Sequence, residues 1–272
     1  MSKSFVYGFI VGIVLLIVEV GAGSQIPRDN SKETEAQIEE MRLFEREVID
    51  ATPTQLGVLT ARQRSHSKLY SVYKDQISRL FSVHEEGTRK TISDFIAHPE
   101  SKVLGVNLGI GLGPKLKESQ TPEEYFGKLA YASDAVIRGR VVQKISQITE
   151  DDTFIFTDYD VEVIEVFKDN ATPLLATGRS IIVTRPGGKV VVDGIIVEIL
   201  DEHFLPLPVD NKAVILFLNY VPETGAYQAT RDTGSFQLDG ETLRPLTGYH
   251  FPPGVLRDSN SFLRTVRAIQ NK

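Results

Sequence analysis

Four carboxylates stand in patterns that could carry chemistry. Asp232 begins the stretch DTGS at 232–235, where the Thr and Gly that follow are typical of a tight turn. A carboxyl presented on such a turn can share a proton with a second carboxyl and act in hydrolysis. Asp158, Asp160 and Glu162 alternate with other residues, so on a strand they would share one face. Such a row of oxygens could bind Ca²⁺ or a basic partner.

The DTGS stretch resembles the signature of aspartic proteases, in which two such aspartates share a proton across a two-fold axis. Three features of the sequence argue against this activity. Arg231 would pair with Asp232 and oppose proton sharing, a second Asp-Thr-Gly or Asp-Ser-Gly is missing, and only about 40 residues follow. We therefore predict a turn between two strands in a protein that is not an enzyme. The alternative is an envelope hydrolase or aspartic-type protease that uses Asp232.

The acidic run is predicted to be a solvent-facing strand face, because like charges at two-residue spacing stay hydrated. A calcium site at Asp158, Asp160 and Glu162 is the alternative, although the glycine spacing of a calcium loop is missing. The five histidines fall in no metal-binding pattern. With no cysteine, the chain has neither a thiol nucleophile nor a thiolate metal site. We predict no cofactor and no metal.

The composition limits the partners of the chain. Its 272 residues are 41% hydrophobic, which is enough for one sizeable core and a smaller appendage. The net charge is −6, and most of it lies in residues 131–272. A negative domain repels polyanions, so nucleic acid is not an expected partner.

The N-terminus predicts export. Residues 5–18 are free of charge and follow Lys3, and small residues come after them, as in a secretory signal. If this segment is not cleaved, residues 5–22 are just long enough to span a bilayer, and Lys3 keeps the N-terminus inside. We expect residues 1–23 to be a signal peptide or a transmembrane anchor. The bulk of the chain would then lie outside the cytoplasm, either tethered to the membrane or, after cleavage, secreted or periplasmic.

Beyond a polar linker at 24–34, residues 35–99 show helical periodicity. One helix is predicted to begin after the N-cap residue Thr60, with apolar side chains such as Leu69 and Tyr73 on its buried side. This helical segment is expected to pack as a hairpin, on itself or on the next domain. The alternatives are a coiled-coil arm that binds a protein partner and a helix that lies on the membrane surface.

Two shorter regions lead into the second domain. Thr91–His98 predicts a short helix. The glycine-rich run at 100–119 lacks the Gly-Lys-Ser/Thr of a phosphate-binding loop and predicts a flexible connector. Thr121 and Pro122 then mark a helix start at the beginning of a domain at 120–272.

Most of this domain is predicted to be strands, because its hydrophobic period changes to two. Gly139 indicates a bulge or a tight bend, and Asp193 and Gly194 indicate a tight turn. The predicted strands lie at 134–143, 154–169, 180–199 (two or three strands) and 212–221, followed by a hairpin of 226–230 with 235–240 and a closing helix at 258–270. The fold class is α+β, with a mostly antiparallel β-barrel or sandwich and flanking helices.

The strand succession over about 131–245 resembles exported bacterial β-domains without an assigned activity. It is also similar to the strand order of OB-type barrels of the netrin or metalloprotease-inhibitor kind. No functional residue can be carried over from this resemblance. Since no motif of the chain supports catalysis, we predict a non-catalytic binding or structural module at the cell envelope. A protein partner would dock on the helical segment or on the acidic strand face.

Overall fold

The computed structural model describes residues 53–71, 91–97, 103–107, 121–172, 174–200, 204–230, 233–240, 242–247 and 259–269. The chain divides into two units, and the described residues belong to the second, Thr52–Lys272. The apolar segment at 5–22, the linker at 24–34 and Asp232 lie outside the described residues. Among those described, no helix is long and apolar enough to cross a membrane.

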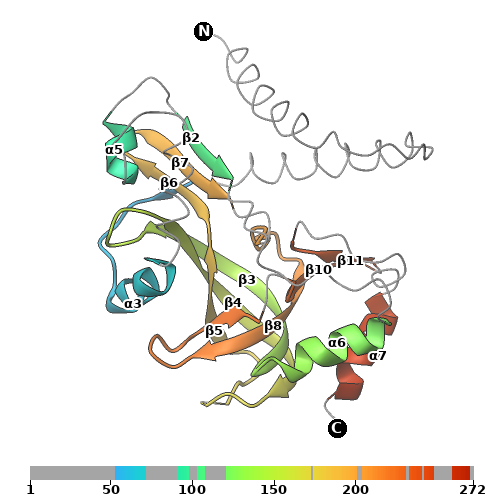
Figure 1. Ribbon diagram of the computed structural model, residues 1–272. Coiled ribbons are helices and arrows are strands. Elements are labelled where there is room, and N and C mark those ends of the chain that lie inside the picture. The colour runs from blue at the N-terminus through green and yellow to red at the C-terminus, as the bar shows by residue number, and fades with distance from the viewer. Residues whose placement is uncertain are drawn as a thin grey trace, which may run out of the picture. The chain divides into compact units, whose positions relative to one another are not determined.

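Five strands of a seven-stranded sheet pair in a closed ring, which we call the strand ring (Figure 1). The neighbours are antiparallel except for β5 and β9, whose parallel pairing closes the ring. In order around the ring, the strands are β3 (Ala135–Ile148), β4 (Ile155–Asp169), β5 (Ser180–Pro186), β9 (Ala226–Ala229) and β8 (Ala213–Val221). The prediction of a mostly β domain is confirmed.

Strand β8 pairs with three other strands, and residues 214–218 in it are buried. One edge pairs with β3, and the other pairs first with β10 (Ser235–Asp239) and then with β9. The predicted hairpin of 226–230 with 235–240 is therefore wrong. Strand β10 pairs with the first half of β8 and β9 with the second half, and the change occurs at Phe217. Phe217 O accepts from Thr230 N, and Phe217 N donates to Gly234 O, both at 2.8 Å. The hairpin partner of β10 is β11 (Thr242–Pro245).

A second sheet has the order β1-β6-β7-β2. Its antiparallel pair is β6 (Gly188–Val192) with β7 (Ile195–Leu200), and the parallel strands β1 (Thr54–Gln55) and β2 (Val103–Asn107) flank it. Asp193 and Gly194 make the predicted tight turn, with φ of 49° and 79°. The flexible connector predicted at 100–119 is wrong over β2, because the backbone of Val103–Asn107 pairs with β7 along its whole length.

Helices α3 and α6 begin where their capping residues predict. Thr60 caps α3 (Ala61–Tyr70) through a capping box with Gln63, and Thr121 caps α6 (Pro122–Tyr131). A single turn, α5 (Ile92–Ile96), precedes β2, and α7 (Ser259–Ile269) closes the chain.

Two hydrophobic clusters hold the unit together. The cluster under α6 and α7 contains the aromatic rings of Phe126, Phe217, Phe236 and Phe262. The cluster between β4 and the second sheet contains Phe154 and the end of α3. Described parts of the helical segment at 35–99 thus pack on the β-rich core, and the division between compact units falls at Thr52 instead.

Candidate functional site

Helix α3 lies against one face of the strand ring and buries a polar side. Its buried residues are Gln63, His66, Ser67 and Tyr70, which the spacing of three and four places on one helix face. Leu69, which the sequence predicts to be buried, is only partly so. The helix is therefore positioned by hydrogen bonds and one aromatic ring rather than by an aliphatic stripe.

His66 and Asp158 form the centre of this contact. The His66 side chain is fully buried, and its Nδ1 lies 2.9 and 3.1 Å from the two carboxylate oxygens of Asp158 on β4. Because a carboxylate only accepts, Nδ1 is the protonated nitrogen. Nε2 is also buried and has no hydrogen-bond partner among the described residues. The imidazole ring meets Phe156 edge-on, with 6.1 Å between centroids.

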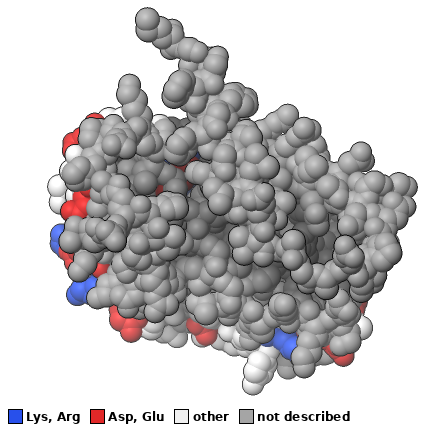
Figure 2. All heavy atoms as spheres, turned by 45° about the horizontal axis from the view of Figure 1, so that its top comes forward, with Lys and Arg blue, Asp and Glu red and all other residues white. Residues whose placement is uncertain are grey.

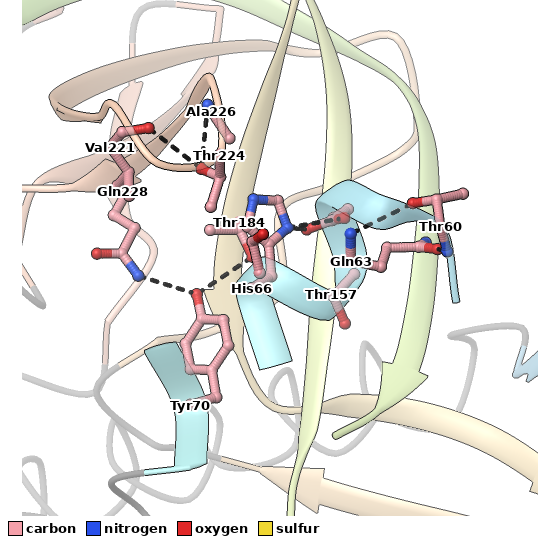
Figure 3. A network of polar contacts seen from close by, with 12 residues as sticks. Thr60, Gln63, His66, Tyr70, Thr157, Thr184, Val221, Thr224, Ala226 and Gln228 are labelled. Atoms are coloured by element: carbon pink, nitrogen blue, oxygen red, sulfur yellow. Dashed lines mark hydrogen bonds and ion pairs between the residues drawn. The ribbon is translucent and has the colours of Figure 1, made fainter. Parts of the chain in front are cut away.

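Tyr70 makes the second contact of α3 with the strand ring (Figure 3). Its hydroxyl donates to Thr184 Oγ1 of β5 at 3.2 Å and accepts from Gln228 Nε2 of β9 at 3.4 Å. Its ring stacks on Phe156 and Phe154, with centroids 5.5 and 6.0 Å away. One residue of the helix thus bridges the two strands whose parallel pairing closes the ring.

The loop between β3 and β4 fastens two helices at once. Ser67 Oγ of α3 accepts from Glu150 N at 2.7 Å. The Asp152 carboxylate accepts from Ser93 N at 2.9 Å, and its backbone O accepts from Ile92 N at 2.7 Å, so this loop also holds the first turn of α5. Glu150 therefore holds α3 through its backbone N–H, and Asp152 holds α5 through its carboxylate and its backbone O.

The three carboxylates proposed for calcium do not converge. Asp158 is 7% exposed and faces His66, so the solvent-facing strand face predicted there is wrong at this residue, because α3 covers it. Glu162 pairs with Arg140 of β3. Asp160 keeps one buried oxygen, Oδ1, without a partner in the described part of the chain. Within that part, no group of three or more His, Asp and Glu side chains could hold a metal ion.

Arg231 and Asp232 are outside the described residues, but the residues that follow Asp232 are described. Thr233 and Ser235 are buried, and Gly234 O accepts from Phe217 N of β8. Ser235 Oγ is buried without a hydrogen-bond partner in the described ranges. The residues after Asp232 are thus part of the ladder of β8 rather than an open loop.

A second group of charged side chains was not predicted from the sequence. Lys189 of β6 and Glu198 of β7 are cross-strand partners with Nζ and Oε1 3.4 Å apart. Burial lowers the pKa of Lys144 on β3, and the charge of Lys189 lowers it further. Burial also raises the pKa of Glu198, against the opposing effect of both lysines. In the sequence, the available signal was a charged residue within each of two apolar strands.

The geometry of His66 and Asp158 resembles the oriented half of a catalytic triad, in which a carboxylate fixes the imidazole. A triad also needs a nucleophile at Nε2 and access for the substrate. The described structure gives Nε2 no partner, and α3 shields the pair from solvent. The pair therefore orients and holds a helix. No protein-family model matches this sequence, and no curated protein matches it significantly.

Proposed function

We propose that this chain is an exported protein, tethered to the membrane through residues 5–22, whose β-rich domain is a non-catalytic binding or structural module. The observation that carries the proposal is the buried contact of His66 with Asp158, which α3 shields from solvent. This pair has the chemistry of an active site, but the fold uses it to dock α3. Its buried position suits a structural role, because proton transfer to a substrate needs contact with that substrate.

The pairing order of the strand ring supports an OB-type barrel. Numbered along the chain, β3, β4, β5, β8 and β9 are its first to fifth strands, and they pair in the order first, second, third, fifth, fourth and back to first. In OB barrels, the face of the second and third strands binds the ligand. Here, Asp158 on that face contacts His66 of α3, and Thr184 contacts Tyr70 of α3 (Figure 3 shows the Thr184 contact). We infer that the helix fills the usual binding face, so ligands bind elsewhere.

The charge distribution supports a partner other than nucleic acid. The net charge of the chain is −6. In Figure 2, the few Lys and Arg side chains that are coloured lie scattered along the rim of the face, close to Asp and Glu side chains. Polyanion binding requires clustered positive charge.

Fractionation of bacterial cells that express the full chain tests the tether. We expect the protein in the membrane pellet, resistant to alkaline carbonate, and degraded when protease is added to spheroplasts. The matched control carries Val14→Arg and Leu16→Arg. Each charge costs about 2.5–3.5 kcal/mol at the centre of a membrane helix, so this variant should leave the pellet. Soluble protein that begins near Gly23 or Gln25 would refute the anchor and leave a signal peptide.

The enzyme alternative has its own test. Purified chain is incubated with an unfolded protein substrate at acidic and neutral pH, beside the Asp232→Asn variant. We expect equal and negligible cleavage by both proteins. Cleavage by the natural chain that Asp232→Asn abolishes, with unchanged circular dichroism, would establish an aspartic-type protease and overturn the non-catalytic proposal.

A further inference from the structure

The parallel joint between β5 and β9 is the shortest of the strand ring, and we call it the seam. Its two strands pair only at Val183 with Tyr227 and at Thr184 with Gln228. Every other pair of neighbours in the ring has a longer ladder. A joint with few backbone pairs separates at the lowest cost, so the ring should open first at the seam.

Tyr70 of α3 lies across the seam and binds both of its strands (Figure 3). Its hydroxyl donates to Thr184 Oγ1 of β5 at 3.2 Å and accepts from Gln228 Nε2 of β9 at 3.4 Å. Thr184 and Gln228 are themselves one of the two seam pairs. The Tyr70 ring is buried and stacks on Phe156 of β4, so the hydroxyl stays at the seam as long as α3 is docked.

The docked face of α3 is polar, which makes the helix easier to release than an element of the aliphatic core. Besides Tyr70, the contacts that hold it are those of His66 with Asp158 of β4 and of Ser67 with the backbone N–H of Glu150. His66 Nε2 is buried without a partner among the described residues, which weakens the docking. After release, water can replace these hydrogen bonds, but it cannot replace the burial of apolar surface.

We propose that α3 is a strap that keeps the strand ring closed, and that its release opens the ring at the seam. The docked helix joins β4, β5 and β9 through one polar face. After release, the seam loses both hydrogen bonds of Tyr70 and keeps only its two backbone pairs. Opening would uncover the paired edges of β5 and β9 and the side chains of Val183 and Tyr227, which are 1% and 3% exposed in the closed ring. The domain would thus alternate between a closed and an open ring, a property that the proposed function does not require.

Hydrogen exchange of the full chain in uncharged detergent, read by mass spectrometry with fragmentation to single residues, tests the strap. Tyr70→Phe loses both hydrogen bonds of the hydroxyl but keeps the stacked ring. We expect the seam-facing amides of β5 and β9 to exchange roughly tenfold faster in this variant, because two hydrogen bonds are lost at the joint. The amides of the β3–β8 joint should exchange at the natural rate. Tyr131→Phe is the matched control, since it removes a hydroxyl from a side chain that is 89% exposed, and it should change neither joint.

His66→Ala tests whether the helix controls the seam from a distance. The hydrogen bond and the ring contact of His66 are with Asp158 and Phe156 of β4, so an effect on β5 and β9 must pass through α3. We expect the amides of α3 and of the seam to exchange faster by similar factors, because one opening event exposes both. The β3–β8 joint should be affected less.

Three outcomes would overturn the strap. They are seam amides that exchange at the natural rate in Tyr70→Phe, an equal acceleration at all joints of the ring, and a His66→Ala variant whose seam stays protected while α3 exchanges faster. If circular dichroism shows that His66→Ala does not fold, the comparison of Tyr70→Phe with Tyr131→Phe decides alone. Failure here would leave the tether and the non-catalytic module untouched, since cell fractionation and the Asp232→Asn assay test those separately.

Discussion

His66 and Asp158 form a buried polar pair that joins α3 to β4. A carboxylate under a helix is tolerated only because Nδ1 donates to it. The pair is still imperfect, since His66 Nε2 has no partner among the described residues. A buried polar atom without a partner costs about 1–3 kcal/mol. The contact thus specifies where α3 docks more than it adds to stability.

Removal of the imidazole should destabilise the protein far more than removal of an exposed ionic partner. His66→Ala leaves the Asp158 carboxylate buried and unpaired, so we expect a loss of about 3–5 kcal/mol in the free energy of unfolding. Urea unfolding monitored by circular dichroism measures it. The double variant with Asp158→Ala should lose less than the sum of the two single variants, because the stranded charge is gone.

The matched control is the exposed pair of Arg267 with Glu165, whose atoms lie 3.0 Å apart. Arg267→Ala should cost less than about 1 kcal/mol. A His66→Ala variant that is no less stable than Arg267→Ala would show that the buried pair does not hold α3.

Tyr227 should make stability fall at high pH. Burial raises its pKa to about 12, and the nearby charges of Asp169, Tyr220 and Asp134 add to the shift. Because the folded state holds the phenolic proton more tightly than the unfolded state, the resulting stability is present below pH 10. It is lost as the pH rises from 10 to about 12.

Urea unfolding at several values between pH 10 and 12 tests this. The free energy of unfolding should fall more steeply with pH in the natural chain than in Tyr227→Phe, which lacks the titrating group. Absorbance near 295 nm follows the tyrosinate directly. Identical slopes in the two proteins would contradict the shift.

At the scale of the elements, Gly139 is required by the crossing of β3 and β4. A Cβ there would lie 2.6 Å from Val161 Cγ1 and 3.1 Å from Glu162 O, beside a register shift in the β3–β4 ladder. Gly139→Ala should therefore cost about 1–3 kcal/mol. Gly127 in α6 is the matched control, because its added Cβ would meet nothing within 4 Å. Gly127→Ala should stabilise by up to about 1 kcal/mol.

Thermal unfolding of the two alanine variants, compared with the natural chain, tests both predictions. The midpoint should fall for Gly139→Ala and rise or stay for Gly127→Ala. A Gly139→Ala protein with an unchanged midpoint would mean that β3 and β4 can separate at no cost.

Local signals predicted these elements well, and pairing partners were predicted poorly. The cap at Thr60, the bulge at Gly139 and the turn at Asp193 depend on nearby residues, so the sequence pattern indicates them directly. The partners of β9 and β10 depend on which half of β8 each one reaches, and no local pattern carries that information. Strand β2 was missed for the same reason, because its ladder with β7 joins distant segments.

The same distinction between local signals and distant contacts explains which features of the candidate site were predicted. The alternation of Asp158, Asp160 and Glu162 correctly places them on one strand face, but it says nothing of a polar helix that covers Asp158. His66 was dismissed because it belongs to no local motif. Its partner is far away in the sequence, and only the docking of α3 brings them together.

At the scale of the whole molecule, the segment of β1 and α3 belongs to the β-rich unit, which begins at Thr52. A chain that begins at Thr52 should keep the urea midpoint of the full chain. A chain that begins at Ser71 loses the cover over Asp158 and the ring of Tyr70. It should lose at least about 3 kcal/mol of unfolding free energy.

Comparison of urea midpoints with the full chain in the same detergent checks both truncations. Equal midpoints for the Thr52 and Ser71 chains would show that α3 is dispensable to the fold. A lower midpoint for the Thr52 chain would show that residues 1–51 support the β-rich unit.

The parallel pairing of β5 with β9 has a consequence for synthesis on the ribosome. The β5 edge that β9 will cover is complete at Pro186, but Ala229 must also be made before the ring can close. At roughly 5–20 residues per second, translation leaves that edge bare for seconds. An unpaired edge is a template for pairing with other chains. We therefore expect the nascent chain to be prone to pairing with other chains during this interval.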